Sequence, residues 1–424
     1  VVDRTNIKSL PAAKILYSIS PHIHALLRNK NVFEPKIGTA REGLRTFDDY
    51  RFLRLRWEVP PLHIGSNEIW ETLAKGGEFA RYYSDLHLLV RWATCGKELA
   101  EENRKVNGQV AQSRQASDYY RRAGGTYSKR SAKGFSIRAL PTGCIIGTKG
   151  PAVLSESKVS PAYIIGWLNS RLIRSLIHIQ ANAYEFNTGI LKRLPWQYAE
   201  ESKKLADNVL ETIHALRREA RLNEANSCFI SVILASSINE IADRIARLSL
   251  EVAQTVAKCQ ATCDEAMDRL YAVDSRSLES LSVENVEDAD GDEDQEDFEE
   301  DSESSISVAI GDRTKATLEL MFYCFGVCVA RWDVRIAIDP SLAPKLPDPF
   351  DPLPLCPPGM LVGPDGLPAE PNRIVSEEWL RARPDANTLP PEGSVMNPTI
   401  PDSEYPLRIS WDGVLVDDPG FNGD

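Results

Sequence analysis

The sequence has 424 residues, of which 42% are hydrophobic, 8% aromatic and 26% charged. This composition is ordinary for a globular protein of about two to four domains, and it excludes a wholly disordered chain, a collagen-like fibre and a small disulfide scaffold. No apolar run reaches the roughly 18 residues that cross a bilayer. No signal peptide opens the chain, so we expect a cytoplasmic protein that binds no membrane.

The net charge of −12 conceals a basic first half and an acidic second half. Residues 1–200 contain 30 Lys and Arg against 17 Asp and Glu, whereas residues 275–306 contain 1 basic and 14 acidic residues. The densest basic stretch, 101–150, also contains three tyrosines and a phenylalanine. Because cations neutralise phosphates and aromatic faces stack on bases, this mixture suits nucleic acid, although a solvated basic face explains it equally well.

The first part of the chain predicts a helical lead-in followed by a loop-rich domain. Residues 1–37 contain an expected helix, Ala12–Arg28, which we take as the end of an upstream domain. From residue 38 to residue 197, short apolar stretches are cut by Gly and Pro, which indicates short strands joined by long loops. Arg51–Trp57 alternates partly with a period of two, and Ser160–Ile179 predicts a helix with a Ser N-cap followed by Pro.

The second part predicts helices, a linker and an arm. Apolar residues at helical spacing over 198–274 predict a hairpin or bundle of helices. Residues 275–306 predict an acidic disordered linker, which alternatively covers the basic surface as a mimic of nucleic acid. Residues 307–337 predict a buried helix, and residues 338–424, with 18 of the 27 prolines, an extended Pro-rich arm on another domain or partner. The predicted fold class is α+β, a loop-rich mixed domain followed by these helices and the tail.

Metal and catalytic motifs are hard to find. None of the eight cysteines forms a CxxC motif or stands near a His at zinc-ligand spacing. Cys259/Cys263 and Cys324/Cys328 are each four residues apart in helical patterns, so a four-thiolate site between two helices is the alternative to buried thiols. GxGxxG, GxxxxGK[ST], HExxH and GxSxG are absent. The residues alone therefore predict a binding protein with no metal site and no catalytic residues.

Several short motifs follow one another in the loop-rich domain. They are Gly43-Leu-Arg-Thr46, Arg51-Phe-Leu-Arg54, Lys75-Gly-Gly77, Gly124-Gly-Thr-Tyr-Ser128, Phe135-Ser-Ile-Arg138, Tyr163–Ser170 and Phe186–Pro195. In this order they resemble the region after the catalytic domain of large adenine-specific DNA methyltransferases, in the type IIG-like and phage-defence (BREX or DISARM class) group. Glu265–Tyr271, Gly326–Arg335 and Asp348–Met360 extend the resemblance over most of the chain.

The resemblance implies that residues 38–197 are a target-recognition domain for double-stranded DNA. Phosphates would be bound by Lys, Arg and glycine-exposed amides, and base edges would be read from a few loops. The candidate DNA contacts are Thr46, Arg51, Lys75, Gly76, Gly77, Thr126, Tyr127, Ser128, Lys129, Lys133, Arg138, Asn187 and Lys192. Each has a structural alternative: Gly76 and Gly77 serve a turn, Tyr127 the core, and Asn187 a loop cap.

The motifs that carry the family's chemistry are missing from the sequence. The family binds S-adenosylmethionine at FxGxG and holds the flipped adenine at [ND]PP[YF]. Val59-Pro-Pro-Leu62 and Asn397-Pro-Thr fit neither pattern. The first methionine is Met267, so we expect a methyltransferase domain upstream of Val1 and no cofactor in this chain. The expected partners are DNA, that upstream domain and other phage-defence subunits.

The predicted function is DNA target recognition for an adenine-N6 methyltransferase, in which methyl transfer from S-adenosylmethionine follows base flipping. The alternative is a non-enzymatic protein-interaction scaffold with an incidental basic surface. A restriction nuclease would need an acidic metal motif such as PD-(D/E)xK, and Pro347-Asp348 has no fitting partner downstream. Salt dependence separates the first two, because binding through several phosphates weakens steeply with salt.

Overall fold

The computed structural model describes residues 20–66, 68–108, 111–182, 184–274, 312–329, 331–362 and 367–368. Within these ranges, helices and short strands occur together, and the predicted α+β class is confirmed. The helices are α2 Pro21–Leu27, α3 Asp49–Phe52, α4 Ala93–Asn107, α5 Pro161–Asn169, α6 Arg171–His178, α7 Thr188–Lys192, α8 Ser202–Ala220, α9 Ile238–Leu270, α11 Arg313–Cys328 and α12 Val334–Ile338. Short 3-10 turns are η2 Arg56–Glu58, η3 Pro61–His63, η4 Ala111–Arg114, η5 Ser117–Tyr119 and η6 Pro340–Leu342.

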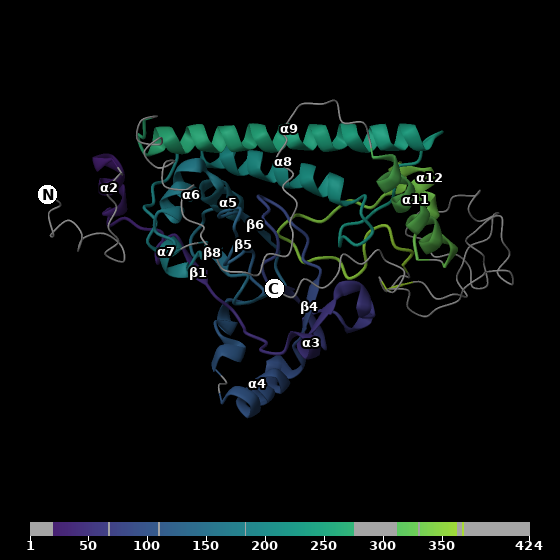
Figure 1. Ribbon diagram of the computed structural model, residues 1–424, viewed down its shortest axis with the longest axis horizontal. Helices are drawn as coiled ribbons and strands as arrows, with labels where there is room; N and C mark the ends of the chain where they lie inside the picture. Colours follow the sequence, from purple (N-terminus) through teal and green to yellow (C-terminus); the bar gives the residue numbers. More distant parts are fainter. Residues whose placement is uncertain are drawn as a thin grey trace, which may run out of the picture.

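Two four-stranded sheets lie at the centre of the first half of the chain (Figure 1). One has the antiparallel order β1–β8–β5–β6, and the other has the order β2–β4–β3–β7, in which only β3 and β7 are parallel. The strands are β1 Gly38–Arg41, β2 Leu53–Leu55, β3 Trp70–Ala74, β4 Leu88–Arg91, β5 Gly124–Tyr127, β6 Ile137–Leu140, β7 Ile145–Ile146 and β8 Ala152–Ser155. They are short because Gly and Pro interrupt the apolar runs, as the sequence indicates.

The main core lies between the first sheet and the helices above it. Helix α5 packs on β5 and β6 on one side and on α8 and α9 on the other, so its residues from Ala162 to Asn169 are all buried. Three aromatic rings meet at its centre: Trp167 lies 5.4 Å from Phe33 and 4.8 Å from Trp196 between ring centroids. This burial of apolar surface is the main force that joins the helices to the sheet.

Two elements differ from those predicted by pattern alone. The helix expected over Ser160–Ile179 is two helices, because Ser170 adopts an extended backbone with ψ 146° and donates its hydroxyl to the Trp167 carbonyl at 2.6 Å. The strand expected over Arg51–Trp57 contains only β2, Leu53–Leu55. The side chain of Asp48 accepts a hydrogen bond from the Arg51 backbone and starts α3, which ends at Phe52.

The C-terminal helix and arm pack on the body. Helix α11 buries only one side, through Ala316, Tyr323 and Gly326, so the prediction of a buried helix is corrected to a half-buried one. Its other side exposes Leu318, Met321 and Phe325, with 45%, 46% and 52% of each residue accessible. The acidic linker, the part of the lead-in helix before residue 20, and most of the arm beyond residue 362 lie outside the described residues.

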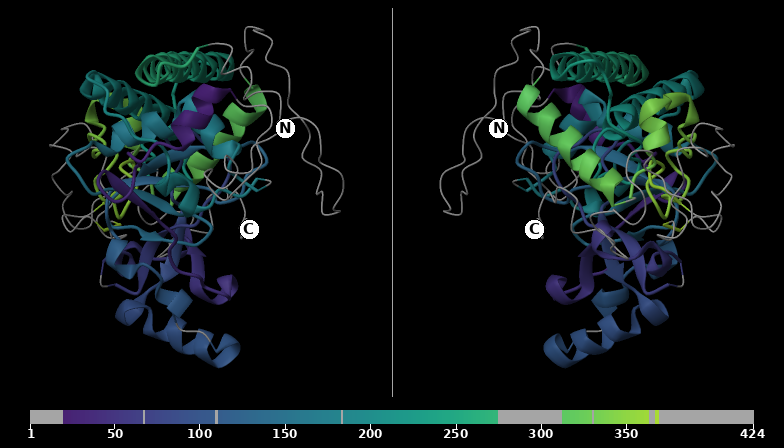
Figure 2. Two further views of the ribbon diagram at one scale, coloured as in Figure 1. Left: turned by 90° about the vertical axis from the view of Figure 1, so that its left-hand side faces the viewer. Right: turned by 90° about the vertical axis from the view of Figure 1, so that its right-hand side faces the viewer.

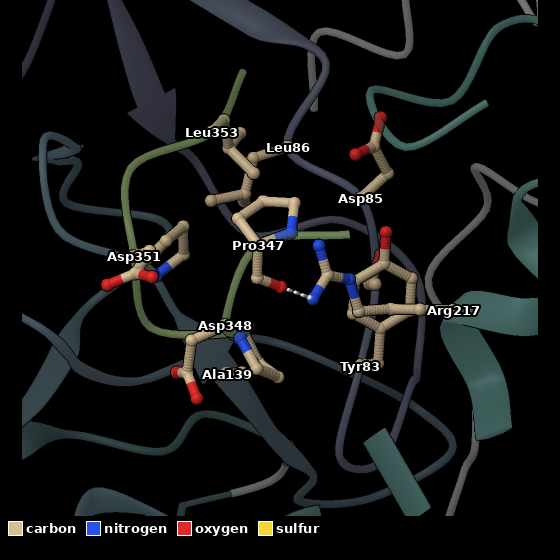
Figure 3. A pocket seen from close by; sticks show the side chains of 12 residues that line it. Tyr83, Asp85, Leu86, Ala139, Arg217, Pro347, Asp348, Asp351 and Leu353 are labelled. Carbon is tan, nitrogen blue, oxygen red and sulfur yellow. Dashed lines mark hydrogen bonds between the residues drawn. The ribbon is translucent and has the colours of Figure 1, made fainter. Parts of the chain in front are cut away.

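The described part of the arm is held by two buried arginines from separate parts of the body. Arg217 of α8 donates to the Pro347 carbonyl at 2.6 Å, filling a small cleft beside Tyr83 and Asp85 (Figure 3). Arg56 donates to the carbonyl of Pro354. The arm is therefore fixed to the second sheet and to α8 at once.

The cysteine pairs do not come together. Cys259 and Cys263 are buried in the main core, whereas Cys324 is exposed on α11. Among the described residues, no group of three or more His, Cys, Asp or Glu could hold a metal ion, so the four-thiolate alternative is wrong for these four residues. No helix in the described part of the chain has the length and apolar character needed to cross a membrane.

Candidate nucleic-acid interface

The loop that follows β3 is built by close backbone packing. Gly76 and Gly77 have φ +111° and +114°, in the region that favours glycine. A Cβ on Gly76 would lie 2.8 Å from the Lys149 carbonyl oxygen. The Gly147 backbone donates to the Ala74 carbonyl at 2.8 Å. The two glycines are therefore required for a tight turn, and Gly77 leaves its backbone exposed at the surface.

Arg138 lies beneath this loop and holds its shape. Only 1% of the residue is exposed, and its guanidinium donates to the carbonyls of Gly76 and of Glu78, the latter at 3.2 Å. Ser128 donates its hydroxyl to the Gly77 carbonyl at 2.6 Å. Burial lowers the pKa of Arg138 to about 10, so the group remains a cation at neutral pH. Arg138 and Ser128 position the loop from inside the protein.

Three further candidates are also buried. Tyr127 is 0% exposed, with its ring 5.2 Å from that of Phe135, and burial raises its pKa. Thr126 donates its hydroxyl to the Pro151 carbonyl at 3.1 Å, and Thr46 donates to Asp49. In this structure Tyr127 is a core residue, which is the structural alternative to DNA contact given for it above. Five of the thirteen candidates thus have side chains inside the protein: Thr46, Thr126, Tyr127, Ser128 and Arg138.

Two of the candidate cations, those of Lys75 and Arg51, are paired with carboxylates. The Lys75 ammonium lies 2.6 Å from an Asp49 oxygen. The Arg51 guanidinium lies 3.0 Å from Glu102 and 3.5 Å from Glu98, both on α4. These ion pairs fix the side chains in place and offset much of their positive charge.

The same holds for two candidates nearer α7. The Lys129 ammonium is 3.1 Å from Glu42 and 3.4 Å from Glu185. Lys192 is 3.5 Å from Glu34. All three carboxylates lie more than 50 positions away in the sequence from the lysines with which they pair. Sequence spacing gives no sign of this neutralisation.

Two exposed lysines, Lys133 and Lys149, are not paired with a carboxylate among the described residues. Lys133 lies in the connection between β5 and β6, and Lys149 lies in the loop that supports Gly76. Lys149 is not among the candidates predicted from the sequence. Its position between Gly147 and Gly150 is the feature that could have indicated an exposed loop cation. Asn187 stands at the N-cap of α7 without a side-chain cap hydrogen bond.

His178 supports the connection that carries Lys133. Its Nε2 accepts the Phe135 backbone N–H at 3.1 Å, which requires an unprotonated nitrogen. Burial, and then the nearby Arg174 cation, lower the pKa of His178 below its usual value. The folded protein therefore resists protonation of this ring more than the unfolded chain does.

We expect this histidine to make the protein less stable in acid. Its folded-state pKa is depressed, so its contribution is fully present above about pH 6.5, the usual pKa of histidine, and is lost as the pH falls through the folded pKa. His178→Gln keeps an acceptor but removes the titration, so urea unfolding free energies should fall less between about pH 8 and about pH 5 in the variant than in the wild type. An equal fall in both proteins would contradict this role. Burial also lowers the pKa of His214. This residue adds the same pH dependence of stability to the wild type and to the variant.

Comparison with known proteins finds similarity to two bacterial adenine-specific methyltransferases. The chain is a partial homologue of adenine-specific methyltransferases, which confirms the resemblance predicted from its motifs. It is 24% identical over 246 residues to the adenine-specific methyltransferase PglX of Lacticaseibacillus casei (strain Zhang), covering 56% of this chain and 20% of that protein. It is 26% identical over 219 residues to BrxX of Escherichia coli O9:H4 (strain HS), covering 49% and 17%.

The chain thus spans about a fifth of the length of these relatives. No family model matches it. A solved structure of the Type IIL restriction-modification enzyme MmeI in complex with DNA aligns with a TM-score of 0.38 and 13% identity, covering 58% of this chain and 34% of that chain. A score at this level does not establish a shared fold.

Proposed function

We propose that this chain recognises a DNA target for an adenine-N6 methyltransferase of a phage-defence system. The observation that carries the proposal is the turn at Gly76 and Gly77, which exposes backbone beside the loop that carries Lys149. Lys149, and Lys133 in the β5–β6 connection, are exposed cations that pair with no carboxylate among the described residues. Exposed amides and unpaired cations are the groups that bind phosphates. The relatives are named adenine-specific methyltransferases, and adenine is a nucleic-acid base, which supports a nucleic acid as the partner.

The proposal assigns recognition, not methyl transfer, to these residues. The sequence contains neither FxGxG nor [ND]PP[YF], so S-adenosylmethionine and the flipped adenine would be held by a separate methyltransferase domain in the cytoplasm. That domain and other phage-defence subunits are the proposed protein partners. Within the chain, Arg138 and Ser128 would act by positioning the turn, and Lys133, Lys149 and Gly77 by contact.

The proposal is tested by the salt dependence of DNA binding. We expect the full chain to bind duplex DNA and to lose affinity steeply between about 50 and 200 mM salt. The pair Lys133→Gln and Lys149→Gln should lower the slope of log affinity against log salt by about 1.8, close to one counterion for each lysine. The matched control pair, Lys203→Gln and Lys204→Gln on exposed positions of α8, should leave the slope unchanged.

Two results would contradict the proposal. One is the absence of duplex binding at low salt, and the other is an equal loss of slope in the control pair, which would mean that net charge alone attracts DNA. The exposed side of α11 favours the scaffold as the second candidate, because Leu318, Met321 and Phe325 form an exposed apolar strip. A scaffold interface of this kind would show little dependence on salt.

A further inference from the structure

We propose that α3, α4 and the loop before α3 form a second DNA-contacting surface, where exposed aromatic rings stack on bases and arginines bind the adjacent phosphates. This proposal rests on the proposed function and extends it. The surface, called here the α3–α4 projection, comprises residues 45–52, 97–108 and 111–115. It lies at the end of the molecule opposite α8 and α9, and α4 extends away from the sheets (Figures 1 and 2).

Polar contacts join the segments at the end of the projection. Asn103, only 2% exposed, donates its amide to the Ser113 hydroxyl at 2.5 Å and to the Arg45 carbonyl at 3.3 Å. The Arg45 backbone N–H donates to the Gln112 carbonyl at 3.1 Å. Three separate segments are therefore joined by buried polar contacts. A preorganised surface of this kind binds without the entropic cost of ordering its parts.

Two aromatic rings of the projection are exposed. Tyr50 is 86% exposed and Phe47 is 40% exposed. Phe47 also has φ +64°, a backbone region that bulky residues rarely adopt. The Arg45 guanidinium lies 5.6 Å from the centre of the Phe47 ring. Aromatic faces presented beside a cation are suited to base stacking or to insertion between base pairs.

Basic residues gather at the end of the projection, where one of them, Lys105, pairs with Glu102 at 3.7 Å. Acidic residues also occur elsewhere in the projection, at Asp48, Asp49, Glu98 and Glu101. Residues 43–47, 103–108 and 111–115 contain four basic residues and no Asp or Glu. Of these, Arg45, Arg104 and Arg114 are exposed, and none makes an ion pair with a residue that the structure describes. Basic residues in the last turn of a helix also stabilise its dipole. That explanation covers Arg104 but not Arg45 or Arg114, which lie outside α4.

The projection is continuous with the turn at Gly76. Asp49, the first residue of α3, accepts hydrogen bonds from both Lys75 and Thr46. One duplex would therefore contact the turn and the projection together, with phosphates near the arginines and bases near Phe47 and Tyr50.

The arginines are tested by affinity in the full chain. We expect Arg45→Gln, Arg104→Gln and Arg114→Gln together to lower the slope of log duplex affinity against log salt by about 2.7. The matched control, Lys203→Gln, Lys204→Gln and Lys258→Gln on α8 and α9, removes the same charge from exposed positions and should leave the slope unchanged. Equal thermal unfolding of the two triple variants shows that both are folded.

The aromatic rings are tested by photocrosslinking to a duplex that carries 5-iodouracil in place of thymine. We expect crosslinked peptides to contain Phe47 or Tyr50. The pair Phe47→Asn and Tyr50→Ala should abolish these crosslinks and weaken binding at least about fivefold, the loss of one base–aromatic stack, with an unchanged salt slope. Asparagine is chosen at 47 because it tolerates a positive φ.

The outcomes separate this inference from the proposed function. If the wild type binds duplex DNA but both variant sets bind as it does, with crosslinks only elsewhere, the projection is not a DNA surface and the turn remains the proposed site. If the wild type binds no duplex DNA at any salt concentration, both proposals are wrong.

Discussion

Arg138→Met is expected to lower the free energy of unfolding by about 4 kcal/mol, the worth of two hydrogen bonds from a charged donor. Methionine fills a similar volume but cannot donate to the carbonyls of Gly76 and Glu78. Those oxygens, which are partly buried, would lose their donor, and a polar group that is removed from water without a partner costs free energy. Urea unfolding of the purified full chain measures the effect.

The same substitution should also weaken DNA binding, because the turn loses its support. Lys133→Gln, in contrast, should weaken binding with little change in stability, since Lys133 is exposed. Arg138→Lys is the matched control: it keeps the charge but reaches fewer carbonyls, so its stability should fall between those of the wild type and the methionine variant. An unfolding free energy for Arg138→Met within about 1 kcal/mol of the wild type would show that the guanidinium does not hold this turn.

Gly150→Ala is expected to cost about 3 kcal/mol or more, or to prevent folding. The new Cβ would lie 2.4 Å from the Gly76 nitrogen and 2.6 Å from both the Ala74 oxygen and the Lys75 carbonyl carbon. All three atoms are backbone, so no side-chain rotation relieves the overlap. The loop at 147–150 and the turn at 75–77 would have to separate. Thermal unfolding and soluble yield measure the effect.

Gly189→Ala in α7 is the matched control for this glycine. Its Cβ would meet only the end of the Arg193 side chain, at 3.4 Å, which can move aside. Alanine also favours a helix over glycine by about 0.5–1 kcal/mol. We therefore expect unchanged or slightly raised stability. Equal stability of the two alanine variants would show that the close approach at Gly150 is relieved at little cost.

The sequence predicted the kinds of element well and the roles of single side chains less well. Period and propensity placed helices over α5, α6, α8 and α9, because each has a long apolar face. The break at Ser170 depends on a local side-chain hydrogen bond that competes with the helix, and the periodicity of the flanking residues does not report it.

The candidate interface shows the limit more sharply. Arg138 and Lys133 are both basic residues in one hairpin, yet one is buried and the other exposed. Lys129 is neutralised by Glu42, which is 87 positions away in the chain. Such pairing depends on tertiary contacts, which one sequence does not reveal. Phe47 and Tyr50 were missed for the same reason, since exposure of an aromatic ring has no periodic signature.

The two arginines that hold the arm affect when the chain can finish folding during its synthesis and which fragments of it can be used. Arg56 and its acceptor Pro354 are 298 positions apart. Arg217 and its acceptor Pro347 are 130 positions apart. A nascent chain can therefore form these long-range contacts only after residues 347 and 354 have been synthesised, which is late in folding. A fragment that stops at residue 274 would leave both guanidinium groups without these acceptors. Recombinant pieces should keep the arm through residue 362 with the body.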